Sequence, residues 1–222
     1  MVNAAIIFDV DGVLLELTRA EEELFFEPFA SRCDVSKLSR DWNSYLIRND
    51  EDIVAELAAR HNLPKSEQPV IIAEYLKLLE QQLSTRQIFS QEIECAAHLL
   101  KSCAEFAALG IATANLREAA KLRLEQASLW PYVSAHAYGA DGGGHKCEIL
   151  GRALATLKLP KSRIIYIGDN VNDVVAGLTH GLHFIGFSQN QNRLAELKLA
   201  GAVNVSANHH QTLALIKSLL TF

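Results

Sequence analysis

Short apolar runs that alternate with helical patterns constrain the fold of this chain more than any other feature. One run opens the chain and the others follow residue 90, and none of them alternates polar with apolar positions. Continuous runs of this kind are typical of parallel strands that helices cover on both faces. Because strands and helices follow one another in series, the sequence predicts an α/β fold with a doubly wound, Rossmann-like parallel sheet.

The boundaries of these elements can be read from the same pattern. Strands are predicted over residues 4–9, 108–114, 135–141, 163–169, 183–188 and 201–206. Helices are predicted over residues 92–103, 117–128, 146–157, 172–179, 191–200 and 209–220.

The segment between the first two predicted strands differs, because it contains no strand-like run. Thr18 with Glu21 three residues later forms a capping box, which predicts the start of a helix. Two further amphipathic helices are predicted in "DEDIVAELAARHNL" and "PVIIAEYLKLLEQQL". We therefore expect residues 1–15 and 89–222 to form the sheet core and residues 16–88 to form an inserted α-helical cap. An insert at this point lies over the edge where such sheets bind ligands.

Composition excludes several classes of protein. The chain has 222 residues, 49% of them hydrophobic, which is enough for a core and an insert. Its net charge of −5 disfavours nucleic acid as a partner, because phosphate backbones attract an excess of Lys and Arg. We find no signal peptide and no apolar stretch approaching ~20 residues, so we expect no membrane contact and a cytoplasmic protein. The four cysteines, Cys33, Cys95, Cys103 and Cys147, have no metal-binding spacing and are interpreted as core residues in a reducing compartment.

Polar residues follow four of the predicted strands, where each strand ends. They are Asp9, Asp11 and Gly12 in "FDVDG", Thr113 in "IATAN", Lys146 in "GGGHK", and Asp169 and Asp173 in "GDNVND". Since the carboxyl ends of parallel strands meet at one edge of the sheet, we expect these side chains to converge there. Clustered carboxylates repel one another unless a cation lies between them. Oxygen ligands without Cys or His favour Mg²⁺, so we predict a magnesium site formed by Asp9, Asp11, Asp169 and Asp173.

The same residues can perform phosphoryl transfer. Asp9 could attack phosphorus as a carboxylate nucleophile, and Asp11 could protonate the leaving oxygen and later deprotonate water. Lys146 would neutralise a phosphoryl oxygen. We therefore predict that Asp9, Asp11, Thr113 and Lys146 are catalytic. Phosphate binding is assigned to Gly12, Thr113, Ala114, Asn115 and Lys146.

These four motifs, in this order, resemble those of the haloacid dehalogenase superfamily of phosphohydrolases. The likeness covers residues 4–15 and about 90–190, and "TANLREAAKLRLEQASLW" with "YGADGGGHK" is most similar to the phosphoglycolate-phosphatase-like members. The resemblance implies a Rossmann-like core, a helical cap and an aspartyl-phosphate on Asp9. It also implies Mg²⁺ held by Asp9, Asp169 and the backbone carbonyl of Asp11. Val13, Ala114 and Glu16 depart from the usual residues Thr, Gly and Asp, and the change at Glu16 concerns substrate selection more than chemistry.

The predicted function is Mg²⁺-dependent hydrolysis of a small phosphorylated metabolite, such as phosphoglycolate or a sugar phosphate. Asp11 argues against a dehalogenase, which does not need a second acid, and against a phosphonatase, which is expected to carry Ala there. A phosphomutase with the same core remains an alternative, because it differs only in how the cap excludes water. A non-enzymatic module that binds phosphate and Mg²⁺ is a second alternative, although the intact set of polar residues disfavours it.

Several residues have a structural interpretation beside the functional one. Asp173 could ligate the metal through water or could only cap a helix that starts near Asn172. Asn115 with Glu118 three residues later is interpreted as a helix N-cap. The histidines His145, His180 and His183 are expected to be structural or at the surface, and His209 and His210 to form a solvated helix start. Glu16, Arg19 and Arg48 are candidates for lining the entrance to the site.

Overall fold

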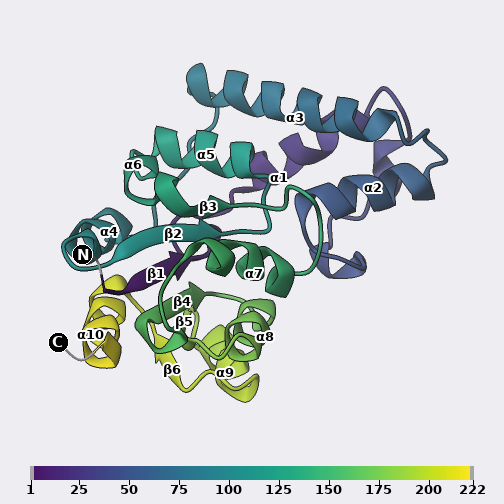
Figure 1. Ribbon diagram of the computed structural model, residues 1–222. Helices are drawn as coiled ribbons and strands as arrows, with labels where there is room; N and C mark the ends of the chain where they lie inside the picture. The colour runs from purple at the N-terminus through teal and green to yellow at the C-terminus, as the bar shows by residue number, and fades with distance from the viewer. Residues whose placement is uncertain (1–2, 221–222) are drawn as a thin grey trace.

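A six-stranded parallel sheet forms the centre of the molecule in the computed structural model, which describes residues 3–220 (Figure 1). The strand order is β3-β2-β1-β4-β5-β6. The strands are β1 (Ala5–Phe8), β2 (Ala108–Ala112), β3 (Ala137–Tyr138), β4 (Ile164–Gly168), β5 (His183–Phe187) and β6 (Asn204–Ser206). β1 pairs with β2 on one side and with β4 on the other, so that Ala5 lies opposite both Ala108 and Ile164. This order reverses at β1, and ligands bind at such switch points.

Helices cover both faces of the sheet, which confirms the predicted doubly wound fold. These helices are α4 (Ala96–Ala104), α5 (Arg117–Gln126), α6 (Trp130–Val133), α7 (Lys146–Thr156), α8 (Val171–Thr179), α9 (Gln191–Leu199) and α10 (His209–Leu220). Successive side chains of a strand point to opposite faces. Ile6 and Phe8 therefore join a buried cluster with α4 and α10, whereas Ala5 and Ile7 join another with α7 and α8. Short 3₁₀ turns occur at Ser134–His136 and Lys161–Arg163.

The segment between β1 and β2 contains helices and no strand among the described residues. Before α4, its helices are α1 (Arg19–Phe26), α2 (Asp50–Arg60) and α3 (Glu67–Ser84), with short 3₁₀ turns at Glu27–Phe29, Val35–Lys37 and Trp42–Ser44. The predicted capping box is present, since the Thr18 side chain accepts from the Glu21 amide and the Glu21 carboxylate accepts from the Thr18 amide. A third buried cluster, rich in Phe and Tyr, holds the three helices together and includes Leu116 and Ala119 near the start of α5. Figure 1 shows α3 beside α5, and α2 next to α3 on the side of the carboxyl edge of the sheet.

Several elements are shorter than the sequence pattern predicts, and β3 and α4 differ most from their predicted bounds. β3 has two residues instead of seven, because after Tyr138 the chain enters a loop in which Gly142, Gly143 and Gly144 all have positive φ. α4 begins at Ala96 rather than near residue 92, because Cys95 adopts a left-handed conformation with φ of 67°. Neither difference moves the carboxyl ends of the central strands. Within residues 3–220, every helix is too short or too polar to span a bilayer.

Candidate active site

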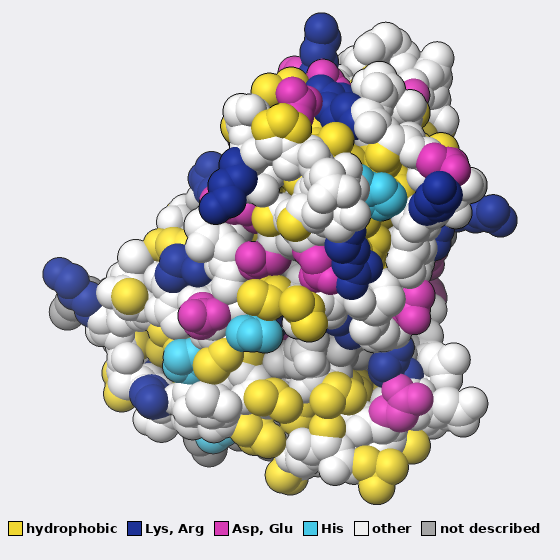
Figure 2. Space-filling view, turned by 90° about the vertical axis from the view of Figure 1, so that its right-hand side faces the viewer, with side chains coloured by type: hydrophobic (Ala, Val, Ile, Leu, Met, Phe, Trp, Pro, Cys, Tyr) yellow, Lys and Arg dark blue, Asp and Glu magenta, His cyan; other side chains and the backbone are white. Residues whose placement is uncertain are grey.

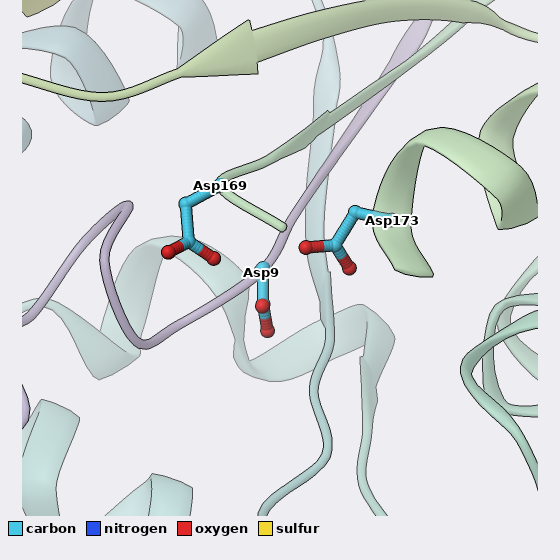
Figure 3. Close-up of side chains that lie close together, drawn as sticks. All are labelled: Asp9, Asp169 and Asp173. Carbon is cyan, nitrogen blue, oxygen red and sulfur yellow. The ribbon is translucent and has the colours of Figure 1, made fainter. Parts of the chain in front are cut away.

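Three carboxylates meet at the carboxyl edge of the sheet. Asp9 directly follows β1, Asp169 directly follows β4, and Asp173 lies in the first turn of α8. Figure 3 shows the three side chains directed toward one another, and one oxygen from each lies within 4.8 Å of the others. The sequence predicted this convergence, but the side chain of Asp11 is not part of the cluster.

Lys146 supplies the positive charge of this cluster. It is the first residue of α7, and its Nζ lies 2.8 Å from Asp9 Oδ1 and 3.0 Å from Asp173 Oδ1. Burial alone would lower the pKa of Lys146, but the charges of Asp173 and Asp9 raise it above its usual value. The ammonium group is therefore charged, as the predicted role requires.

The carboxylates outnumber the cations, and their pKa values reflect this. Burial raises the pKa of Asp9 to about 7, although Lys146 opposes the shift and Asp173 adds to it. Burial and the charges of Asp173 and Asp9 also raise the pKa of Asp169 well above its usual value. A cation between these oxygens would lower both pKa values.

Asp173 has structural contacts as well as a place in the cluster. Its Oδ1 accepts a 2.6 Å hydrogen bond from the Tyr166 hydroxyl, and its Oδ2 accepts from the Asn170 amide at 3.1 Å. The second bond belongs to a capping box with Asn170, so α8 begins at Val171. The capping interpretation is therefore confirmed, and with Lys146 also at 3.0 Å both oxygens of Asp173 have protein partners.

Gly12 is required by the close packing of its loop against Asp169. Its φ is 73°, and a Cβ at this position would lie 2.4 Å from Asp169 Oδ2. Any other residue would displace either the loop or the carboxylate. The glycine after the Asp9–Asp11 pair therefore allows the loops after β1 and β4 to meet.

Asn115 does not cap a helix, contrary to the prediction. α5 begins at Arg117, and Leu116 occupies the N-cap position without a side-chain bond. Carboxylates from other segments accept hydrogen bonds from the free amides at this end. The Leu116 amide donates to Asp50 at 2.8 Å, and the Arg117 amide donates to Asp141 at 2.7 Å. The Asn115 side chain donates to Asp11 Oδ2 at 2.8 Å instead.

Thr113 is buried and lies where the sequence placed it, directly after β2. Its amide donates to the carbonyl of Tyr138, and its hydroxyl accepts from the Asn115 amide at 3.2 Å. The Thr113 hydroxyl therefore helps to shape the loop that ends at Asn115.

Arg123 is a polar residue of the site that the sequence analysis missed, and Asp50 is another. The structure buries the Arg123 side chain, which is 3% exposed, and places Nη1 2.7 Å from Asp11 Oδ1. The signal was the position on α5: Leu116, Ala119, Ala120 and Leu124 are buried, and a helix with this spacing buries position 123 as well. A charged residue on a buried face needs a charged partner.

A cavity of about 730 Å³ lies between this edge of the sheet and the helical segment. Every residue assigned above to catalysis, metal or phosphate lines it. The helical segment contributes Phe25, Trp42, Arg48, Asp50, Ile53 and Tyr75. Of the three residues proposed for the entrance, Arg48 lines the cavity, whereas Glu16 and Arg19 are not among its lining residues. Figure 2 shows acidic side chains along the middle of the face that lies on the right of Figure 1.

The histidines differ in how well they were predicted. His145 precedes α7, and its backbone amide donates to the Glu148 carboxylate at 2.7 Å. His180 Nε2 lies 2.8 Å from the Cys147 carbonyl. His209 begins α10 as predicted, but the expectation that it is solvated was wrong, because this residue is 2% exposed and its ring stacks on Phe187. Its Nε2 lies 2.9 Å from the Val13 carbonyl, so the start of α10 packs on the loop after Asp11.

A doubly wound parallel sheet with an acid cluster, a lysine and a threonine at its carboxyl edge has the architecture of an α/β enzyme. The chain belongs to the haloacid dehalogenase-like hydrolase family, whose family model matches residues 6–187. It is thus a hydrolase by family, and the predicted resemblance is confirmed.

Solved structures of this family have the same fold at low sequence identity. A predicted phosphatase from Clostridium acetobutylicum is 21% identical with a TM-score of 0.71, covering 98% of this chain and 100% of its own. CbbY from Rhodobacter sphaeroides, solved in complex with phosphate, is 20% identical with a TM-score of 0.70, covering 93% and 95%. YfnB from Bacillus subtilis, a HAD-hydrolase bound to magnesium, is 15% identical with a TM-score of 0.66, covering 97% and 99%. A comparison with curated protein sequences gives no match.

Proposed function

We propose that this hydrolase is a Mg²⁺-dependent phosphatase that forms an aspartyl-phosphate on Asp9. The observation that carries the proposal is the meeting of Asp9, Asp169 and Asp173 within 4.8 Å, with Lys146 2.8 Å from the proposed nucleophile. A nucleophilic carboxylate beside a buried ammonium group and further acids suits attack on a dianionic phosphoryl group.

The residues at this edge fit a magnesium ion. The three side chains that converge here are carboxylates, and burial raises the pKa of Asp9 and Asp169. A bound dication would offset this excess of negative charge. Asp9, Asp169 and the backbone carbonyl of Asp11 would hold the ion. Asp173 already has partners on both oxygens, so it would act in the outer shell. The ion would supply positive charge beside the transferring phosphoryl group. The magnesium bound to YfnB and the phosphate bound to CbbY, which share this fold, support both assignments.

The remaining residues divide the chemistry between them. Asp9 attacks phosphorus, while Lys146 and Thr113 stabilise the charge that develops on the phosphoryl oxygens. Asp11 protonates the leaving oxygen and then deprotonates the water that hydrolyses the aspartyl-phosphate. Gly12, Ala114 and Asn115 present loop groups to the phosphate from the same cavity wall.

Residues 16–88 act in this proposal as a cap on the core formed by residues 1–15 and 89–222. Contacts between the two parts support this division: Glu51 accepts from the Gly142 amide at 2.7 Å, and Asp52 accepts from the Gly144 amide at 2.8 Å. These contacts hold the start of α2 against the loop that leads into Lys146. A covered cavity of about 730 Å³ suits a small phosphorylated metabolite as the substrate, with no nucleic acid or membrane as a partner.

The proposal is tested with 4-nitrophenyl phosphate in the presence of Mg²⁺. The wild-type protein should release 4-nitrophenol, and Asp9→Asn should neither turn over nor form a phosphoenzyme. The matched control is Asp34→Asn, an exposed residue that caps the 3₁₀ turn Val35–Lys37, none of whose residues line the cavity, and it should keep wild-type activity. Borohydride reduction followed by mass spectrometry locates the acyl phosphate. Label on a residue other than Asp9 would contradict the assignment.

Variants of Asp9 and Asp11 should show different kinetic defects in this assay. 4-Nitrophenolate is a good leaving group that barely needs a proton, so Asp11→Ala should retain the first step. Water remains a poor nucleophile without a base, and such assistance is commonly worth about 10²–10⁴ in rate. Asp11→Ala should therefore give a burst near one equivalent of 4-nitrophenol followed by slow turnover. Steady turnover at the wild-type rate would overturn the role of Asp11.

A further inference from the structure

We infer that Arg123 is a positioning residue for Asp11, and that Glu21 of the helical segment holds Arg123 in place. The inference rests on the proposed function, because it concerns the residue assigned as the acid and base. It adds a requirement that the sequence motifs do not contain: the Asp11 carboxylate is oriented by two side chains from the segment that follows β2.

Both oxygens of Asp11 have a partner from this segment. Arg123 Nη1 forms an ion pair with Asp11 Oδ1 at 2.7 Å that lacks hydrogen-bond geometry, and Asn115 Nδ2 donates a hydrogen bond to Asp11 Oδ2 at 2.8 Å. Arg123 Nη1 also donates to Asn115 Oδ1 at 2.8 Å. The three side chains therefore form a closed triangle. A carboxylate bound on one oxygen can still rotate about its terminal torsion, whereas one held on both oxygens keeps its plane.

Arg123 is itself fixed by the other contacts of its guanidinium group. Its Nε donates to Glu21 Oε1 at 2.8 Å, and its Nη2 donates to the backbone carbonyl of Glu16 at 3.1 Å. With the contacts to Asp11 and Asn115, all three nitrogens of the guanidinium group are engaged. A guanidinium group that is already held by several partners loses little further conformational entropy when it binds another carboxylate.

Glu21 is an equally well-fixed anchor, and its side chain is 3% exposed. Its Oε1 also accepts from the Ser90 hydroxyl at 3.0 Å, and its Oε2 accepts from the Thr18 hydroxyl at 2.8 Å and the Thr18 amide at 3.0 Å. The contacts therefore form a chain from the start of α1, through Glu21 and Arg123, to the carboxylate that lines the cavity.

A purely structural ion pair would have different consequences from a positioning pair. Loss of a structural contact would weaken the fold and would affect every step of the reaction alike. Loss of a positioning contact would slow only the steps that use Asp11. A displacement of about 1 Å can cost on the order of 10²-fold in rate, so a change in this triangle is measurable.

Arg123→Lys is the test variant, because lysine keeps the positive charge but lacks the planar guanidinium group that contacts several partners at once. With 4-nitrophenyl phosphate, the burst should keep its wild-type rate within about twofold, and steady turnover should fall by about ten- to a hundredfold. The KM should change less than kcat. Arg32→Lys is the matched control, since Arg32 also binds two glutamates, Glu67 and Glu74, but lies outside the cavity lining. The control should retain wild-type turnover.

A double-mutant cycle separates positioning from structure. In an Asp11→Ala background, Arg123→Lys should cause no further loss beyond about twofold, because there is no carboxylate left to position. An equal loss in both backgrounds, a slower burst, or unchanged turnover in Arg123→Lys would each overturn the inference.

Glu21→Gln provides a second variant if Arg123→Lys does not fold, because Gln preserves the shape and one acceptor. It should show the same pattern with a smaller loss of steady turnover, and a loss of the burst rate instead would refute the inference. A wild-type protein that forms no phosphoenzyme on Asp9 would overturn the proposed function, and the inference with it. If the wild-type protein forms the phosphoenzyme on Asp9 but the variants do not show the predicted pattern of the double-mutant cycle, the inference alone would be overturned.

Discussion

Asp50 at the start of α2 offers a test of the cavity that does not depend on catalysis. Its Oδ2 accepts from the Leu116 amide at 2.8 Å, and its own amide donates to the Ala114 carbonyl at 3.0 Å. Burial raises the pKa of Asp50 from 3.8 to about 7, although the bond from Leu116 opposes the shift. We predict that Asp50→Asn stabilises the protein above neutral pH, because the amide can still accept this bond and cannot ionise.

The magnitude follows from the pKa difference between the folded and unfolded states. Between pH 3.8 and about 7, native Asp50 keeps a proton that the unfolded chain has lost, so the free energy of unfolding falls as pH rises. At about 1.4 kcal/mol per pKa unit, the full cost is about 4 kcal/mol. The N-terminus of α2 favours the carboxylate and returns up to about 1 kcal/mol. The expected net cost of ionised Asp50 is therefore about 3 kcal/mol.

Urea unfolding of both proteins at about pH 5 and pH 8 measures this effect. The advantage of Asp50→Asn should be about 2 kcal/mol larger at pH 8 than at pH 5, because ionisation is mostly complete only at the higher pH. Asp41→Asn, whose side chain is exposed, is the matched control and should show the same difference at both pH values. An advantage that does not grow with pH, or a destabilised Asp50→Asn at pH 8, would refute the reasoning.

Three further predictions concern the metal, the phosphate contacts and the packing of α10. EDTA should abolish turnover of 4-nitrophenyl phosphate and added Mg²⁺ should restore it, whereas full activity in EDTA would contradict the proposed metal dependence. Lys146→Ala and Thr113→Ala should each lower kcat by about 10²–10³, because each removes a preorganised donor; a loss below about threefold for both, at saturating substrate, would mean that neither contacts the phosphoryl group. Burial lowers the pKa of His209 from 6.5 to about 4, so the unfolded chain gains a proton first as pH falls and about 3 kcal/mol of stability is lost between these values. His209→Gln, followed by urea unfolding at pH 7 and about pH 4.5, should lack this loss, and an unchanged pH dependence would contradict it.

The sequence predicted most of the sheet and of its carboxyl edge, because both depend on local patterns and on topology. Continuous apolar runs specified all six strands, although the short edge strand β3 was predicted too long. Once the strands are parallel, Asp9 after β1 and Asp169 after β4 must lie at the same edge, since these strands pair directly. The contact between Lys146 and Asp9 follows from the same topology.

The missed features depend on partners distant in sequence. Asn115 and Glu118 have the local spacing of a helix cap, but Asp50 from the helical segment binds the Leu116 amide and leaves the Asn115 side chain free for Asp11. A local pattern cannot contain a bond between residues separated by 66 positions. His209 was predicted to be solvated for the same reason, because its burial depends on the packing of α10 against Phe187.

The excess of negative charge at the carboxyl edge of the sheet favours the binding of a cation at this site. The buried carboxylates of Asp9 and Asp173 contact the ammonium group of Lys146, and the half-buried carboxylate of Asp169 lies beside them. A pair that served only stability would need one carboxylate, because each additional buried charge without a partner costs several kcal/mol. Gly12 nevertheless lets its loop pack close to Asp169, where a side chain would push the carboxylate away. The fold thus retains an acid that no described cation balances, and raised pKa values of Asp9 and Asp169 are the consequence. A divalent cation with oxygen ligands would supply the missing charge, and this is the physical basis for the proposed dependence of activity on Mg²⁺ and for expecting the ion to stabilise this edge.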